Sequence, residues 1–294
     1  MIMIRTGRIA ALFQILLLMI PLNASGAKVR VTWNPAAVHR GAVVPLRVEF
    51  PGDLYRVEAV VGGERFPLIP SPQGGQVALV GIDLDHQGDT LPVLFRLRPY
   101  GSREPRDLVA ELRIREKDFT SQSLSLPTGM VDLDREKQRR VSRDSVRTKE
   151  ALRARAKERY WSAGFARPAE GRVSTFFGTA RVLNRVPRSP HRGVDIAAPR
   201  GSPVKSANSG VVTLVGDLFL SGRTVVVDHG WGVSTLYAHL DTITVREGQF
   251  VRRGELLGTV GSTGRATGPH LHFGAFIRGA NVDPLQLIRA TAGF

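Results

Sequence analysis

The pattern of apolar and polar positions predicts strands in the first part of the chain. Between residues 28 and 117, short runs alternate apolar and polar residues with the two-residue period of a half-buried β-strand. Residues of the Gly, Pro and Asp types separate these runs, as at turns. The runs are Val29–Trp33, Val44–Phe50, Arg56–Val61, Val77–Val80, Val93–Leu97 and Leu108–Ile114. This spacing of short strands predicts an N-terminal immunoglobulin-like β-sandwich over residues 28–117.

A charged segment follows, and residues 118–170 are predicted to form a linker with a charged helix. Between Asp132 and Arg159 there are eleven Lys and Arg residues and six Asp and Glu residues, with no Gly or Pro. The few apolar residues lack a clear helical period, which is typical of a solvated helix that joins two domains. The alternative interpretation is a basic helix that docks on an anionic surface.

Residues 171–294 return to the pattern of a β domain. Strands are predicted at Gly210–Val215, Thr224–Asp228, Gly232–Tyr237, Leu256–Val260 and Leu271–Ile277. Glycines between them indicate tight turns and strands that approach a groove closely. The predicted fold class is therefore mainly β.

The first 27 residues have the pattern of a signal peptide. Arg5 and Arg8 precede an apolar run, Ile9–Leu22, and small residues follow at Ala24–Ala27. About 14 apolar residues are too few for a membrane span, which needs ~20, but suit the centre of a signal peptide. We therefore expect an exported protein of the periplasm or cell envelope. An uncleaved leader is the alternative, and it would be the one expected contact with a membrane.

The amino-acid composition limits the catalytic groups, metal sites and binding partners that can be expected. The chain has no cysteine, which excludes disulfides, a thiol nucleophile and a cysteine-type zinc site. The net charge of +15 favours anionic partners, although solubility alone can explain it. No zinc finger, RNP-type aromatic motif or basic zipper occurs, so no nucleic-acid partner is expected.

Five of the seven histidines lie between residues 191 and 272. His270 and His272 are two apart, so on a strand their side chains point to the same face. His191 and Asp195 are four apart across a glycine, which suits a turn that enters a strand. Two imidazoles and one carboxylate, with a fourth position open to water, are a typical ligand set of catalytic zinc, and the remaining residue would then handle protons. No H-E-x-x-H motif is present, so a helix-borne glutamate is not the expected base.

Three motifs in this region resemble the LytM/lysostaphin-type zinc metallopeptidases, peptidase family M23. The similarity covers about 120 residues. The motifs are Phe177-Gly178 with His191-Arg192-Gly193-Val194-Asp195 and Gly201–Val204, then Tyr237-Ala238-His239-Leu240, then Gly261–Gly264 with Thr267–Phe273. The resemblance implies a lysostaphin-like antiparallel-β peptidase domain at residues 171–294.

The resemblance also implies a role for each site residue. His191, Asp195 and His272 would be the ligands of a Zn²⁺ ion, and His239 and His270 the catalytic histidines beside the metal-bound water. The implied function is a secreted zinc endopeptidase that hydrolyses peptide cross-links or stem peptides of bacterial peptidoglycan by zinc-activated water. The bond that is cut and the division of proton transfer between His239 and His270 stay open.

Two other functions fit the sequence less well. A catalytically silent activator or scaffold of other cell-wall hydrolases would have lost part of the ligand set, which is complete here. A biotinyl- or lipoyl-like carrier domain needs a lysine on an exposed turn, and residues 206–294 contain none. The oligomeric state stays open, as does the role of the N-terminal domain, which could be a spacer, a wall-binding module or an autoinhibitory cover.

The remaining candidates have less specific roles. His229 is predicted to be structural or to support the site from behind, and His39 and His86 to be ordinary structural residues. Tyr237 is predicted to share a strand face with His239. The loop from Thr179 to Pro190 is predicted to form one wall of a cleft, where its basic residues meet substrate carboxylates or only solvent.

Overall fold

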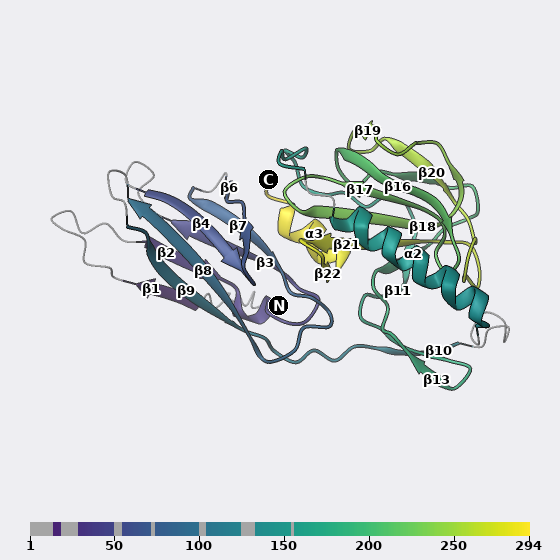
Figure 1. The fold of residues 1–294 in the computed structure, drawn as a ribbon, viewed down its shortest axis with the longest axis horizontal. Coiled ribbons are helices and arrows are strands. Elements are labelled where there is room, and N and C mark those ends of the chain that lie inside the picture. The colour runs from purple at the N-terminus through teal and green to yellow at the C-terminus, as the bar shows by residue number, and fades with distance from the viewer. Residues whose placement is uncertain are drawn as a thin grey trace, which may run out of the picture. The chain divides into compact units, whose positions relative to one another are not determined.

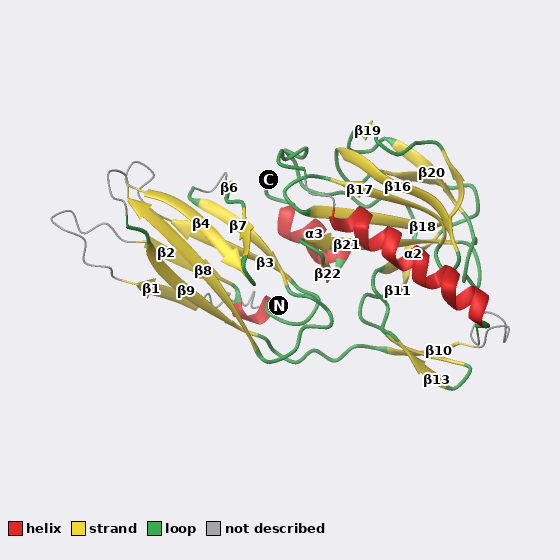
Figure 2. Ribbon diagram, viewed as in Figure 1, coloured by secondary structure: helices red, strands yellow, loops and turns green. Residues whose placement is uncertain are grey.

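The computed structural model describes residues 14–18, 29–49, 55–71, 74–99, 104–124, 133–153 and 156–294. The chain divides into two compact units. The first consists of Met1–Val38, Val44–Leu79 and Gly88–Arg115, and the second of His39–Val43, Val80–Gln87 and Glu116–Phe294. Strands dominate both units, which confirms the mainly β prediction (Figure 2). Of the predicted leader, only Gln14–Leu18 lies within the described residues.

Two antiparallel sheets make up the first unit (Figure 1). Among the described residues, one sheet has the order β1-β2-β3-β7-β6 and the other β5-β4-β8-β9. The strands are β1 (Gln14–Leu18), β2 (Val29–Trp33), β3 (Val43–Glu49), β4 (Tyr55–Val61), β5 (Glu64–Phe66), β6 (Ile69–Pro70), β7 (Gln76–Gly81), β8 (Thr90–Pro99) and β9 (Arg106–Arg113), and a short 3-10 helix, η1, spans Pro35–Ala37. The order β2-β3-β7-β6 against β5-β4-β8-β9 is the one an immunoglobulin-like sandwich would have. That assignment stays a prediction.

Sequence alternation explains the strands of this unit. Along β9, Leu108, Ala110 and Leu112 are buried, while Val109 between them is 53% exposed. One face of the strand therefore joins the core and the other meets water. At the β4–β5 connection, Gly62 and Gly63 both have positive φ, at 56° and 81°. Two consecutive residues with positive φ form a tight two-residue hairpin turn, whose twist matches that of the strands it connects.

A larger antiparallel sheet forms the centre of the second unit. Its main path runs β11-β14-β21-β18-β17-β16-β19, with β15, β20 and β22 paired beside it. The strands are β11 (Arg172–Thr175), β14 (Val194–Ala197), β15 (Pro203–Lys205), β16 (Gly210–Leu218), β17 (Gly222–Asp228), β18 (Val233–Ile243), β19 (Phe250–Val251), β20 (Leu256–Val260), β21 (His270–Ile277) and β22 (Ala280–Val282). A small separate sheet contains β10 (Ser121–Leu124), β12 (Ala180–Leu183) and β13 (Val186–Arg188), in that order.

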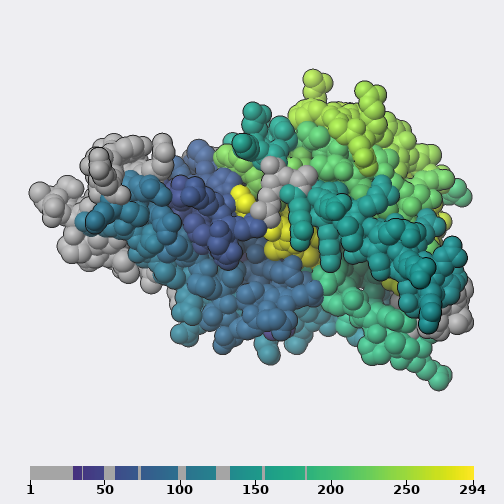
Figure 3. Space-filling model, in the orientation of Figure 1, coloured from purple at the N-terminus to yellow at the C-terminus, as the bar shows by residue number. Residues whose placement is uncertain are grey.

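Two helices accompany the larger sheet. Helix α3 (Pro284–Thr291) begins with an Asp283 cap, whose side chain accepts a hydrogen bond from the Leu285 amide. Helix α2 (Arg135–Arg153) lies across β16 and β17 (Figure 1), and its side chains are among the teal ones on the visible face in Figure 3. No helix within the described residues is long and apolar enough to cross a membrane.

Helix α2 is packed along one side, whereas the sequence predicted a solvated helix. Its Ala151 is 7% exposed and belongs to a cluster with buried residues of three strands, namely Leu214, Leu218, Val226, Leu236 and Ala238. Ala238 is the cross-strand partner of His272, and directly paired residues share a face of the sheet. Helix α2 therefore covers part of the same sheet face that carries His272. The predicted domain boundaries themselves stay predictions.

Replacing Ala151 tests this packing. Ala151→Glu would bury a carboxylate among apolar side chains, so we expect the second unit to lose about 3 kcal/mol of stability. The measurement is chemical or thermal unfolding of the full chain. Val146→Glu is the matched control, because Val146 lies on the same helix but is 53% exposed, and it should change stability by less than about 0.5 kcal/mol. Equal effects of the two substitutions would contradict the docking of this helix face.

Candidate metal centre and catalytic site

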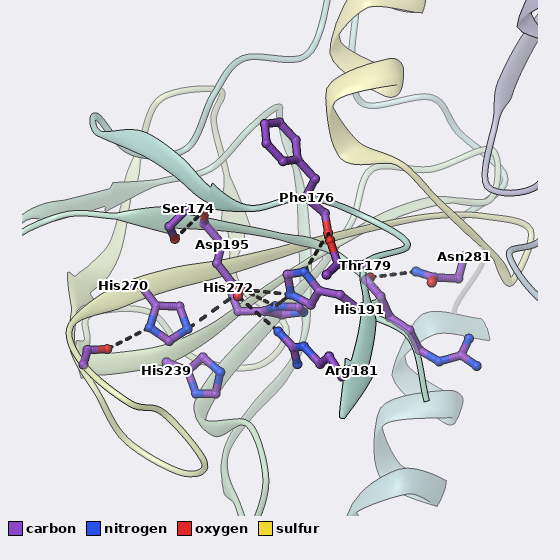
Figure 4. A network of polar contacts seen from close by, with 12 residues as sticks. Ser174, Phe176, Thr179, Arg181, His191, Asp195, His239, His270, His272 and Asn281 are labelled. Carbon is purple, nitrogen blue, oxygen red and sulfur yellow. Dashed lines mark hydrogen bonds and ion pairs between the residues drawn. The ribbon is translucent and has the colours of Figure 1, made fainter. Parts of the chain in front are cut away.

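Three predicted ligands meet at one point in the structure (Figure 4). His191 Nε2 lies 2.9 Å from His272 Nδ1, and Asp195 Oδ1 lies 2.9 Å from His191 Nε2 and 2.8 Å from His272 Nδ1. Tetrahedral ligands about 2.0 Å from a metal are about 3.3 Å apart, so these near-equal distances fit one ion at the centre of the triangle. The three residues could together hold a metal ion.

Strand pairing and one glycine bring these residues together. Asp195 on β14 is the direct cross-strand partner of His272 on β21, so both side chains lie on one face. Gly193 lets the two segments approach: a Cβ there would lie 2.4 Å from the Phe273 carbonyl oxygen and 2.8 Å from the His272 ring. The glycine of the H-R-G-V-D motif is thus required by close packing against His272.

Asp195 is the electrostatic centre of the site. Its side chain is 8% exposed, and burial alone would raise the pKa of the carboxyl. The close contacts with His191 and His272 outweigh burial and hold the pKa of Asp195 well below its usual range. The carboxylate is therefore ionised at neutral pH, and it supplies the one negative charge of the cluster.

Main-chain carbonyls orient three of the four histidines. The Nδ1 atoms of His191, His239 and His270 lie 3.0, 2.8 and 2.8 Å from the carbonyl oxygens of Phe176, Thr263 and Gly268. A carbonyl only accepts, so each Nδ1 carries the proton and each Nε2 keeps its lone pair. Burial lowers the pKa of His191 to about 4 and that of His239 to about 3, so both rings are neutral at neutral pH.

His239 and His270 lie beside the ligand triangle. Their ring centroids are 4.8 Å apart, the His239 ring is 6.0 Å from the His272 ring, and His270 Nε2 is 3.9 Å from Asp195 Oδ1. Figure 4 shows the two imidazoles next to the Asp195 and His272 side chains. The structure therefore brings together all five residues that the sequence singled out: His191, Asp195, His239, His270 and His272.

A β-bulge places His239, which corrects one prediction. Between the paired positions Val225–Tyr237 and Arg223–Leu240, β18 advances three residues while β17 advances two, and His239 within this step has φ of 62°. The bulge turns His239 to the face of His272. Tyr237 points to the other face, where its hydroxyl accepts a hydrogen bond from the Ala207 amide. The predicted shared face of Tyr237 and His239 is therefore wrong.

Arg181 is a site residue that the sequence did not identify individually. It lies on β12, and its Nη2 atom is 3.2 Å from Asp195 Oδ2. The guanidinium thus holds the carboxylate oxygen that faces away from the ligand triangle, which fixes Oδ1 toward the two imidazoles. The sequence placed this arginine only in a basic loop, with no signal for its contact.

Comparison with known proteins assigns this region to a family. The family model described as "Peptidase family M23" matches residues 189–284. Similar curated proteins include the DD-carboxypeptidase/endopeptidase Mpg of Neisseria meningitidis serogroup B, 48% identical over 101 residues, which are 34% of this chain and 23% of that protein. The peptidoglycan DD-endopeptidase ShyA of Vibrio cholerae is 42% identical over 118 residues, 39% of this chain and 27% of that protein. The matched region thus spans about a quarter of those relatives' length.

A solved structure extends the likeness beyond the site. A crystal structure from Pseudomonas aeruginosa described as a peptidase M23 superposes with a TM-score of 0.65 at 29% identity, over 86% of this chain and 95% of that chain. The chain contains a peptidase M23 domain. The predicted family resemblance is confirmed, and with it the antiparallel-β peptidase fold of the C-terminal part.

His229 lies in the core of the M23 domain, away from the ligand triangle. It is fully buried; its Nδ1 donates to the Ser209 carbonyl oxygen, and its Nε2 lies 2.7 Å from the Thr235 hydroxyl, which is 2.8 Å from the Tyr237 hydroxyl. This chain of hydrogen bonds ties β18 to the segment before β16. It agrees with the structural role expected from the sequence.

The pKa of His229 predicts an acid-sensitive core. Burial lowers this pKa from 6.5 to about 4, so the folded domain binds fewer protons than the unfolded chain in this range. The free energy of unfolding is therefore unaffected by this histidine above pH 6.5. It decreases as the pH falls toward 4, by about 3 kcal/mol in total. The measurement is denaturant unfolding between pH 7 and 4.5 at constant metal content. His229→Gln should show a smaller loss than the wild type, and an identical pH dependence would disprove the assignment.

Proposed function

We propose that this protein is an exported zinc-dependent endopeptidase that hydrolyses peptides of bacterial peptidoglycan. The observation that carries the proposal is the convergence of His191 Nε2, His272 Nδ1 and Asp195 Oδ1 beside two further imidazoles. The relatives named DD-endopeptidase support the substrate class. Export is supported by the signal-peptide pattern of residues 1–27 and by that substrate, which lies outside the cytoplasmic membrane.

The donor set fits zinc. Two neutral imidazoles and one carboxylate are ligands that Zn²⁺ accepts in catalytic sites with an open fourth position. Bound there by His191, Asp195 and His272, the ion would polarise a peptide carbonyl and lower the pKa of a coordinated water to about 7. Arg181 would keep Asp195 Oδ1 turned toward the ion.

His239 and His270 are suited to proton transfer. Each is fixed through Nδ1 to a carbonyl, so each offers Nε2 to the site. A neutral imidazole accepts a proton from an attacking water, and its protonated form donates to a leaving amine. Their fixed rings place both groups without rearrangement, which is the arrangement that hydrolysis requires.

The complete residue set favours an enzyme over a silent activator. Burying a carboxylate and orienting three histidines costs folding free energy. An activator that only docks a partner does not need these groups. The presence of all five residues at one place favours a domain that binds metal and catalyses a reaction.

Substitution of the two histidines of the H-x-H motif separates metal binding from catalysis. We expect about one zinc ion per wild-type chain, His272→Ala to abolish metal binding, and His270→Ala to retain the metal but lose hydrolysis by at least about 100-fold. Metal content is measured by elemental analysis of the purified protein, and hydrolysis by peptide release from sacculi.

His86→Ala is the control for these variants, because His86 is not one of the residues of the cluster, and it should retain both metal and activity. A wild-type protein that cannot be loaded with metal would refute the enzyme assignment. Full activity of either His270→Ala or His272→Ala would refute the assignment of that residue.

Digestion of purified sacculi identifies the reaction. We expect the zinc-loaded protein to release muropeptides whose masses differ from those of undigested material by the hydrolysis of one peptide bond. Mass spectrometry of the products reveals which bond is cut. Absence of any product from metal-loaded protein would count against peptidoglycan as the substrate.

A further inference from the structure

The Gly-Ser-Thr-Gly segment that precedes the H-x-H motif, Gly261–Gly264, packs tightly against the first residue of β17. A Cβ on Gly264 would lie 2.3 Å from the Gly222 nitrogen, and a Cβ on Gly222 would lie 2.3 Å from the Thr263 hydroxyl oxygen. Two glycines thus let the backbones of the loop and the strand touch. The half-buried Thr263 side chain lies at this contact, where its hydroxyl can reach the backbone of the sheet.

The Thr263 hydroxyl joins two neighbouring strands at the bulge that carries His239. It accepts a hydrogen bond from the Arg223 amide at 2.9 Å and donates one to the Leu240 carbonyl oxygen at 2.8 Å. Arg223 on β17 and Leu240 on β18 are direct cross-strand partners, and their pair borders the bulge. The hydroxyl therefore satisfies one donor and one acceptor of the sheet at the place where the bulge interrupts regular pairing.

The backbone of the same threonine holds the His239 ring. The Thr263 carbonyl oxygen accepts from His239 Nδ1 at 2.8 Å, and the His239 amide donates to the Ser221 carbonyl oxygen at 2.9 Å. Because the hydroxyl and the carbonyl belong to one residue, the two hydroxyl hydrogen bonds also fix the position of the carbonyl. Thr263 thereby links the bulge, which turns His239 toward the site, to the acceptor that keeps the proton on Nδ1 and the lone pair on Nε2.

We propose that Thr263 is a positioning residue for hydrolysis, whose hydroxyl holds in place the carbonyl that orients His239. The role rests on the proposed function and adds to it a residue outside the ligand triangle. The hydrogen bonds of Thr263 described above involve His239 and the backbone of β17 and β18, and none of them involves His191, Asp195 or His272. Loss of the hydroxyl therefore impairs proton transfer and leaves the metal bound.

Substitution of Thr263 by residues with and without a hydroxyl tests this role. Thr263→Val removes the hydroxyl at nearly constant volume, so the Arg223 amide and the Leu240 carbonyl lose this partner. With the zinc-loaded full chain and soluble muropeptides, we expect kcat to fall by about 10- to 100-fold, while KM and the zinc content stay unchanged. Thr263→Ser keeps the hydroxyl, and it should recover most of the lost rate.

The tautomer of His239 provides a second measurement, which does not depend on turnover. NMR of the imidazole nitrogens in histidine-labelled, zinc-loaded protein shows which ring nitrogen carries the proton, and the His239 signal is identified by its loss in His239→Ala. We expect the proton on Nδ1 in the wild type and in Thr263→Ser. In Thr263→Val we expect a mixture of both tautomers, because the tautomer of a neutral imidazole is set by its hydrogen-bond partners.

Thr244→Val is the matched control. The Thr244 hydroxyl donates to the Leu256 carbonyl oxygen at 3.0 Å, so this substitution also removes a hydrogen bond from a threonine hydroxyl to a backbone carbonyl in the M23 domain. That bond involves neither His239 nor the loop that orients it. The kcat of Thr244→Val and its His239 tautomer should equal those of the wild type. Unfolding curves of all variants separate a loss of rate from a loss of fold.

The outcomes separate this role from the proposed function. Wild-type kcat and tautomer in Thr263→Val, a loss of zinc from this variant, or an equal loss of rate in Thr263→Ser would overturn the positioning role and leave the peptidase intact. If Thr263→Val does not fold, Thr263→Ala, which also lacks the hydroxyl, gives the same comparison. If the wild type cleaves no muropeptide, the proposed function fails, and the tautomers still decide whether the Thr263 hydroxyl orients His239.

Discussion

The site depends on a buried carboxylate that must be neutralised by its neighbours. Asp195 is almost enclosed, and an unpaired charge there would cost several kcal/mol. Its two oxygens are divided between partners: Oδ1 faces His191 and His272, and Oδ2 faces Arg181. This division requires β14, β21 and β12 to hold their mutual positions. The fold around the site is therefore organised to satisfy one negative charge.

Main-chain carbonyls provide the second level of organisation. The carbonyls of Phe176, Thr263 and Gly268 each accept from one histidine, so the ring orientations are determined by loop conformation. The loop that contains Thr263 packs closely against Gly222, the first residue of β17. A Cβ at Gly222 would lie only 2.4 Å from the Thr263 backbone. The protein backbone itself thus sets the ring orientations, which limits the reorganisation needed for binding or catalysis.

The sequence predicts the regular elements well and the irregular ones poorly. Val29–Trp33 and Leu256–Val260 agree with β2 and β20 residue for residue, because alternation and flanking turns define them. The H-x-H pair lies on a strand as expected. The face of His239 was missed, because period-two reasoning assumes an unbroken strand and a bulge reverses it. Arg181 was missed because its role depends on a short hairpin whose sequence has no strong turn signal. The packing of α2 was missed because it uses small residues such as Ala151.

The bulge in β18 has a consequence for the redesign of such domains. A positive φ at a non-glycine residue costs about 1 kcal/mol, so an optimisation for stability alone would regularise the strand at His239. The regular strand would keep the sheet, the ligand triangle and the buried core, but it would turn the His239 imidazole into the opposite layer. A more ideal scaffold would then be a less complete enzyme. In this domain the irregular backbone at His239 positions a site residue, so it should be preserved when the surrounding sequence is changed.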